Sequence, residues 1–103
     1  MKRDEQLSKL IELGIPDYMH EGILAYVHDG RPTGSFLRAV LTGNFREMCN
    51  RADNENQKKF YEWGFFLYNY APMACWGSEE NVTNWINHKG MKFEYPREPD
   101  PRD

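Results

Sequence analysis

Cysteine is scarce in this chain, and its scarcity excludes two kinds of small protein. Cys49 and Cys75 are the only two cysteines among the 103 residues, and neither belongs to a CxxC motif or to a Cys/His spacing that could hold zinc. A disulfide-stapled secreted domain and a structural zinc module are therefore excluded. We expect two reduced, buried thiols, no metal site and no cofactor.

Long hydrophobic runs are also missing. The N-terminal stretch MKRDEQLSKL is charged where a secretory signal would be apolar. The most apolar stretch, residues 60 to 76, is interrupted by Glu62, Asn69 and Pro72, and it is shorter than the roughly 20 residues of a membrane span. The sequence therefore predicts no membrane partner and a cytoplasmic location.

The chain has no excess of positive charge. Its 13 Lys and Arg residues against 16 Asp and Glu residues give a net charge of −3. Because proteins hold a phosphate backbone mainly with Lys and Arg, general nucleic-acid binding is not expected. A chain of 103 residues has room for one hydrophobic core, so we expect a single domain.

Apolar residues recur with helical spacing along most of the chain. Leu7, Leu10 and Ile11, for example, lie three and four positions apart. Residues typical of helix starts open the six periodic segments, namely Asp4, Pro16, Ser35, Asn44, Asp53 and Ser78. The fifth segment is the longest and is predicted to run to Ala71, because Pro72 disfavours helical backbone in the residue before it. The pattern predicts an all-α fold, a single small bundle of five or six helices.

The C-terminal residues lack this periodicity. Residues 91 to 95, MKFEY, alternate in a way that is compatible with a lone extended strand. The final stretch, PREPDPRD, contains three prolines, five charges and no apolar residue, which is typical of disorder. We therefore predict a helical domain over residues 1–90 and an extended or disordered, flexible charged tail over residues 91–103.

More than half of the aromatic residues lie between Phe60 and Trp76, within the stretch FYEWGFFLYNYAPMACWGS. We expect Phe60, Trp63 and Leu67 in the core, with Gly64 on the same side, and Trp76 and Trp85 closing the base of the bundle. Glu55, Glu62 and Asn69 form only a narrow polar stripe, which predicts a central helix covered by its neighbours.

One helix face cannot hold all of these rings, so some of them are expected to bind a partner. The candidate partner-binding residues are Tyr61, Phe65, Phe66, Tyr68 and Tyr70. Phe65 and Phe66 flank the polar stripe, and large apolar residues left exposed usually mark an interface. We expect these two residues to help build a homo-oligomer.

The stretch GRPTGS, residues 30 to 35, suggests an anion site at the start of a helix. The candidate anion-binding residues are Arg31, Gly34, Ser35 and Arg38. A nucleotide-binding P-loop is ruled out, because Ser35 and Phe36 follow the second glycine where that motif needs Lys and then Ser or Thr. The simpler interpretation is a helix end, a proline turn and a new helix cap.

A polar cluster, Arg51, Asp53 and Asn56, lies in the stretch RADNEN. Its oxygen atoms could bind a hard cation, but the alternating ligands of a calcium loop are missing, so Asp53 is better explained as a helix cap with Asn56 bonding to nearby backbone.

His20 and His28 do not have a ligand spacing, and His28 is explained by its position near a helix C-terminus. No paired carboxylates, nucleophile elbow or Cys/His dyad can be read from the sequence. The sequence therefore predicts a protein that is not an enzyme.

Four stretches together resemble a family of short proteins encoded by tailed bacteriophages and prophages. They are PDYMHEGILAYVHDGRPTGSFLRAVLTGNF, RADNENQ, FLYNYAP and CWGS followed by Trp85, and the likeness covers residues 15 to 86. The chain departs from the family at Gly43–Asn44–Phe45, where relatives carry two polar residues and then leucine. The family has no established activity, so the resemblance implies a phage origin and a bacterial host cell and does not imply a mechanism.

Three functions follow as hypotheses. By analogy, a small phage protein without catalytic motifs binds a host protein stoichiometrically, such as a component of a defence system. The alternative is a sponge for a nucleotide-derived signalling molecule, with the GRPTGS corner on phosphate and tyrosines or Trp76 stacking on a base. A hydrolase of such a signal would need a catalytic group that the sequence does not reveal.

Overall fold

The computed structural model describes residues 2–93, and within this part of the chain every regular element is helical. The predicted all-α fold is confirmed. The elements are α1 (Arg3–Glu12), α2 (Asp17–Asp29), α3 (Ser35–Thr42), α4 (Phe45–Arg51), α5 (Asn54–Gln57), α6 (Phe60–Tyr70), η1 (Met73–Cys75), α7 (Glu79–Asn87) and η2 (Gly90–Phe93), where η denotes a 3-10 helix.

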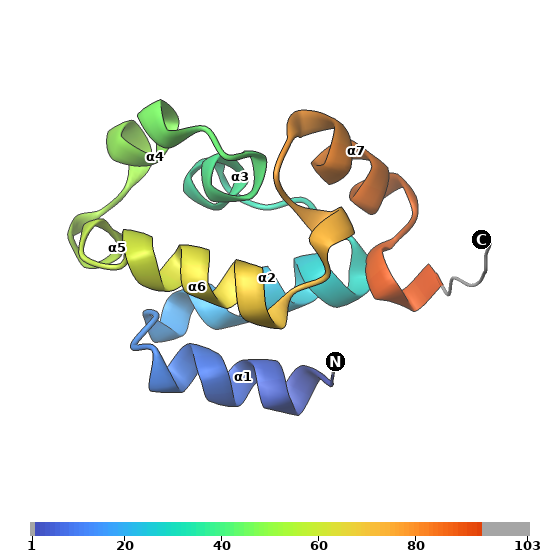
Figure 1. The fold of residues 1–103 in the computed structure, drawn as a ribbon, viewed down its shortest axis with the longest axis horizontal. Helices are drawn as coiled ribbons and strands as arrows, with labels where there is room; N and C mark the ends of the chain where they lie inside the picture. Colours follow the sequence, from blue (N-terminus) through green and yellow to red (C-terminus); the bar gives the residue numbers. More distant parts are fainter. Residues whose placement is uncertain (1, 94–103) are drawn as a thin grey trace.

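Helix α6 runs across the middle of the molecule, with α1 on one side and α3 and α4 on the other (Figure 1). The core contains large side chains from most of the helices, including Tyr26, Leu41, Trp63, Phe66 and Trp85. The indole of Trp85 donates to the Tyr26 and Val27 carbonyls at 3.0 and 3.1 Å, which ties α7 to α2. Phe36 packs edge-on against Trp63 at 6.3 Å, which joins α3 to α6.

Most of the helix boundaries lie where the cap residues predict them. Asn44, Asp53 and Ser78 each accept a hydrogen bond from the backbone N–H three residues later. Two of the predicted caps are wrong. Helix α1 begins at Arg3 with Lys2 in the cap position, so that Asp4 lies in its first turn, and Ser35 is the first residue of α3 because Gly34 is the cap.

The predicted fifth helix is broken into two, which is why seven α-helices occur in the described residues where five or six were expected. The break falls at Lys58 and Lys59, although neither glycine nor proline is present there. Asn56 and Trp63 would lie about 10 Å apart along the axis of a continuous helix. The break brings the indole N–H of Trp63 within 3.0 Å of Oδ1 of Asn56, whose side chain is buried.

The end of α2 and the start of η2 meet at two glycines. Gly30 has φ of 70° and Gly90 has φ of 63°, and a Cβ added to either residue would come within 2.6 Å of the backbone nitrogen of the other. Only glycine fits this contact. Residues 91–93 belong to the 3-10 helix η2, so the predicted strand is wrong there. The rest of the predicted tail lies outside the described residues.

None of the helices among the described residues is both long enough and apolar enough to cross a membrane.

Candidate functional site

Helix α6 has one buried face and one exposed face. Trp63, Phe66 and Leu67 point into the core and are at most 1% exposed. The outer face of α6 consists of residues at positions i, i+3, i+4, i+7 and i+8, namely Tyr61, Gly64, Phe65, Tyr68 and Asn69, and all five are exposed. The predicted covered central helix is therefore wrong on this side.

Exposure separates the five predicted partner-binding residues. Tyr61 is 74% exposed, Tyr68 is 72% exposed and Phe65 is 37% exposed. Phe66 is fully buried, so its expected exposure is wrong. One step along a helix turns the side chain by about 100°, and this rotation sends Phe66 inward and its neighbour Phe65 outward.

The fifth predicted residue, Tyr70, is half-buried at the edge of the outer face. Its ring lies 6.3 Å from that of Phe65 and 6.2 Å from that of Phe66. The ammonium of Lys9 on α1 lies 5.4 Å from the centre of the Tyr70 ring, a cation–π contact. Tyr70 therefore serves the packing of α1 against α6 and forms a boundary of the outer face.

The outer face of α6 contains a hollow centred on Gly64. Its volume is about 360 Å³, and it is lined by Phe60, Tyr61, Gly64, Phe65, Tyr68 and Asn69. A Cβ built on Gly64 would meet no other atom within 4 Å, and the backbone there does not require glycine. The prediction that Gly64 faces the core is wrong. The missing side chain leaves a recess between the rings of its neighbours.

A buried amide anchors the C-terminal end of α6. Gln6 of α1 is fully buried; its Nε2 donates to the Tyr70 carbonyl at 2.7 Å, and its Oε1 accepts from Nε2 of His28 at 2.5 Å. Burial, followed by the charge of Arg3, lowers the pKa of His28. This role of His28 was not predicted, although Gln6 is a signal for it, because this polar residue lies on the same helix face as the apolar Leu10.

Two members of the predicted polar cluster, Asp53 and Asn56, bond to each other and position α5 and α6. The third member, Arg51, is paired elsewhere. Asp53 caps α5 through the Asn56 backbone N–H at 2.9 Å, and its other carboxylate oxygen accepts from the Tyr18 hydroxyl at 2.6 Å. This hydrogen bond raises the pKa of Tyr18 to about 12 and lowers that of Asp53. The Asn56 side chain bonds to Trp63 and Asp53 and not to backbone, and Arg51 pairs with Glu47 at 3.1 Å.

The four predicted anion-binding residues do not line one common hollow, and Arg38 is already paired with a carboxylate. Ser35 and Arg38 line a shallow hollow together with Arg51, Glu47 and Glu79, and Arg38 binds Glu79 at 2.7 Å. This lining carries two basic and two acidic side chains, so it offers no net positive charge to a phosphate. The predicted members Arg31 and Gly34 do not line this hollow.

The two thiols and His20 show no arrangement typical of a metal site or a catalytic dyad in residues 2–93. Cys75 is buried, which raises its pKa to about 12, but Cys49 is exposed, so the expectation that both are buried is wrong. His20 bonds to the Ile15 carbonyl at 2.8 Å. No group of three His, Cys, Asp or Glu side chains that could hold a metal occurs among residues 2–93.

The chain matches no known family model, no curated protein and no solved structure. The geometry of the described residues favours the outer face of α6 as the candidate site.

Proposed function

We propose that this protein acts by stoichiometric binding to another protein, and that the outer face of α6 is the surface that docks. The observation that carries this proposal is the exposure of Tyr61 and Tyr68, each more than 70% accessible on a helix whose other side is fully buried. A tyrosine ring offers a large apolar area with a hydroxyl at its tip, which is why tyrosine is enriched at protein interfaces.

The use of the polar side chains supports binding over catalysis. Asp53 is occupied as a helix cap, His28 by Gln6 and Arg38 by Glu79. Each of these groups holds two elements of the protein together. Tyr61 and Tyr68 of the outer face have no such task among residues 2–93, where they stay largely exposed, so a partner is the simplest explanation for them.

The class of partner that we propose follows from the phage origin that the resemblance implies. By analogy with small phage proteins that bind host proteins, the proposed target is a protein of the bacterial host, and a component of a defence system is the leading candidate. The nucleotide-sponge alternative has less support, since the hollow beside Arg38 is balanced in charge. Native mass spectrometry of the purified protein with a panel of cyclic and linear nucleotides tests that alternative.

Capture from a bacterial lysate tests the proposal. The wild-type chain is compared with the double variant Tyr61→Ser/Tyr68→Ser, and Ile11→Ser serves as the matched control because Ile11 is also an exposed apolar residue, on α1. We expect one or more host proteins to be retained by the wild type and by Ile11→Ser and to be lost with the double variant. Equal recovery with all three chains, or no recovery with any of them, contradicts the proposal.

A further inference from the structure

We propose that the outer face of α6 also pairs with the same face of a second copy of the chain, with the two α6 helices antiparallel and crossing at Gly64. The resulting contact is a two-fold symmetric dimer. It does not require a foreign partner, although a host protein bound at the outer face would compete with the second copy.

The first argument is the spacing of the outer face. Tyr61 and Tyr68 lie symmetrically about the point between Gly64 and Phe65. A two-fold axis through that point places Tyr61 of one copy opposite Tyr68 of the other, and it places Phe65 opposite Gly64. Each copy therefore carries both the apolar knob and the hollow that receives it.

The second argument is Gly64 itself. A glycine inside a helix costs about 1 kcal/mol relative to alanine, and nothing among residues 2–93 requires it, since a Cβ there would point into open space. The hollow of about 360 Å³ above it is large enough to admit part of a phenyl ring. Small residues let helix backbones approach closely, so the glycine is explained when a second helix crosses there.

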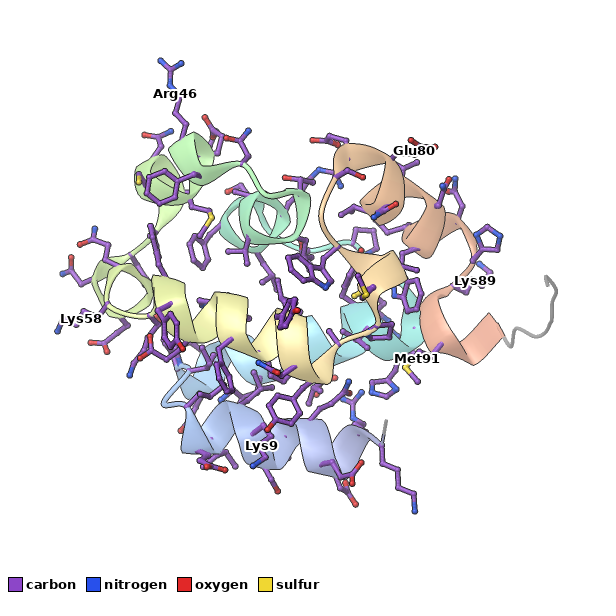
Figure 2. All side chains as sticks on the ribbon, viewed as in Figure 1. Lys9, Arg46, Lys58, Glu80, Lys89 and Met91 are labelled. Atoms are coloured by element: carbon purple, nitrogen blue, oxygen red, sulfur yellow. The ribbon has the colours of Figure 1, made fainter. Side chains whose placement is uncertain are left out.

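The third argument is charge, and it selects the antiparallel orientation. Lys58 is exposed and points outward at the end of the molecule where α6 begins (Figure 2). The last turn of α6 contains no basic residue of its own, and Lys9 of α1, over the Tyr70 ring, is the cation described near the partial negative charge of this helix end. Antiparallel pairing brings Lys58 of each copy to the end of the other α6, whereas parallel pairing brings the two lysines together.

The available area sets the expected strength. Two tyrosines that are 74% and 72% exposed and Phe65 at 37% offer roughly 350 Å² of ring surface. Phe45, which is 65% exposed and whose ring lies 6.0 Å from Phe60, adds about 100 Å² at the edge. A stable interface buries about 800 Å² on each partner. The dimer is therefore expected to be weak and to form only at high protein concentration.

Sedimentation equilibrium of the purified full chain, from low micromolar to several hundred micromolar, tests the pairing without any lysate. We expect a monomer–dimer equilibrium for the wild type that is weakened at least about tenfold by Gly64→Leu, which fills the hollow. Gly22→Leu is the matched control, because Gly22 is exposed within α2 and a Cβ there also meets nothing within 4 Å. Circular dichroism checks that both variants are folded.

Disulfide trapping tests the orientation in a Cys49→Ser background, which removes the exposed thiol. Mixing the Tyr61→Cys and Tyr68→Cys variants should give a crosslinked heterodimer. Either variant alone should crosslink poorly, because its two thiols are displaced by about 10 Å along the helices. A monomer at every concentration, a dimer that Gly64→Leu leaves unchanged, or crosslinking of Tyr61→Cys with itself overturns the proposal. Capture of a host protein by a strictly monomeric chain would leave the proposed function standing.

Discussion

Hydrogen bonds to buried polar atoms fix the tryptophan side chains of the core. Asn56 is the clearest case, since its one buried side chain accepts from the Trp63 indole and donates to the Asp53 carboxylate. A buried donor that loses its partner retains the full cost of its desolvation. The two buried indoles of Trp63 and Trp85 are both partnered, and the first depends on a residue that the sequence presents as a surface amide.

Asn56→Ala should lower the free energy of unfolding by about 1–3 kcal/mol, because the Trp63 N–H is then buried without an acceptor. Asn54→Ala is the matched control, since Asn54 belongs to the same short helix and is exposed. Urea denaturation followed by tryptophan fluorescence measures both variants. Equal stability of the two variants would show that the Asn56–Trp63 hydrogen bond does not contribute.

The two tryptophans near the base of the bundle should respond differently to loss of the indole nitrogen. Trp76 Nε1 is buried with no acceptor in the described part of the chain, whereas Trp85 Nε1 has two backbone acceptors. The free energy of unfolding should therefore fall less in Trp76→Phe than in Trp85→Phe. The expected difference between the two variants is about 1–3 kcal/mol. Urea denaturation of the two variants makes the comparison, and an equal loss would contradict the assignment.

Asp53 should make stability depend on acid pH. Its pKa is lowered in the folded protein, first by the hydrogen bond from Tyr18, below the ordinary value of 3.8. A lowered pKa stabilises the fold above the ordinary value, and this stabilisation is lost as the pH falls through the folded pKa. The wild type should thus lose more stability than Tyr18→Phe between about pH 5 and pH 2. Parallel curves for the two proteins would exclude the Tyr18–Asp53 link.

At the scale of the elements, the helix ends are fixed by local chemistry and by one close contact. Gly30 and Gly90 bring the end of α2 against η2, with both residues in the left-handed region. Gly30→Ala should destabilise by roughly 2 to 4 kcal/mol, because it adds both backbone strain and overlap with η2. Gly22→Ala should instead stabilise by about 0.4–1 kcal/mol. Thermal unfolding measures whether each variant is more or less stable than the wild type. A Gly30→Ala variant that is more stable than the wild type would contradict the close contact between Gly30 and Gly90.

The elements were largely predictable from sequence, because caps and glycines act locally. Asn44, Asp53 and Ser78 mark their helix starts correctly. The break at Lys58 and Lys59 was not predictable, since neither glycine nor proline marks it, and the hydrogen bond between Asn56 and Trp63 that accompanies it joins two different helices.

The candidate site was predictable in part. The expected exposure of Tyr61, Phe65 and Tyr68 agrees with the structure, whereas the expected exposure of Phe66 and the expected core position of Gly64 are both wrong. A small residue on a helix carries no indication of which side it faces. The ion pair between Arg38 and Glu79 joins residues far apart in sequence, so the charge balance of the predicted anion corner could not be read in advance.

In the molecule as a whole, the two sides of α6 contrast sharply. One side closes the core with fully buried rings, while the other presents rings and a hollow that residues 2–93 leave uncovered. Both proposals, a host protein and a second copy, use this same surface. They share the central claim that the outer face of α6 is a protein contact.

Photo-crosslinking from the outer face of α6 is the most direct measurement of that claim. A benzophenone amino acid is introduced at Tyr61 or Tyr68 and, as the control, at Ile11, which is also an exposed residue but lies on α1. Each protein is irradiated both purified and in bacterial lysate. The account predicts covalent protein adducts from positions 61 and 68 well above those from position 11. Adducts from position 11 that equal or exceed those from α6 would contradict it.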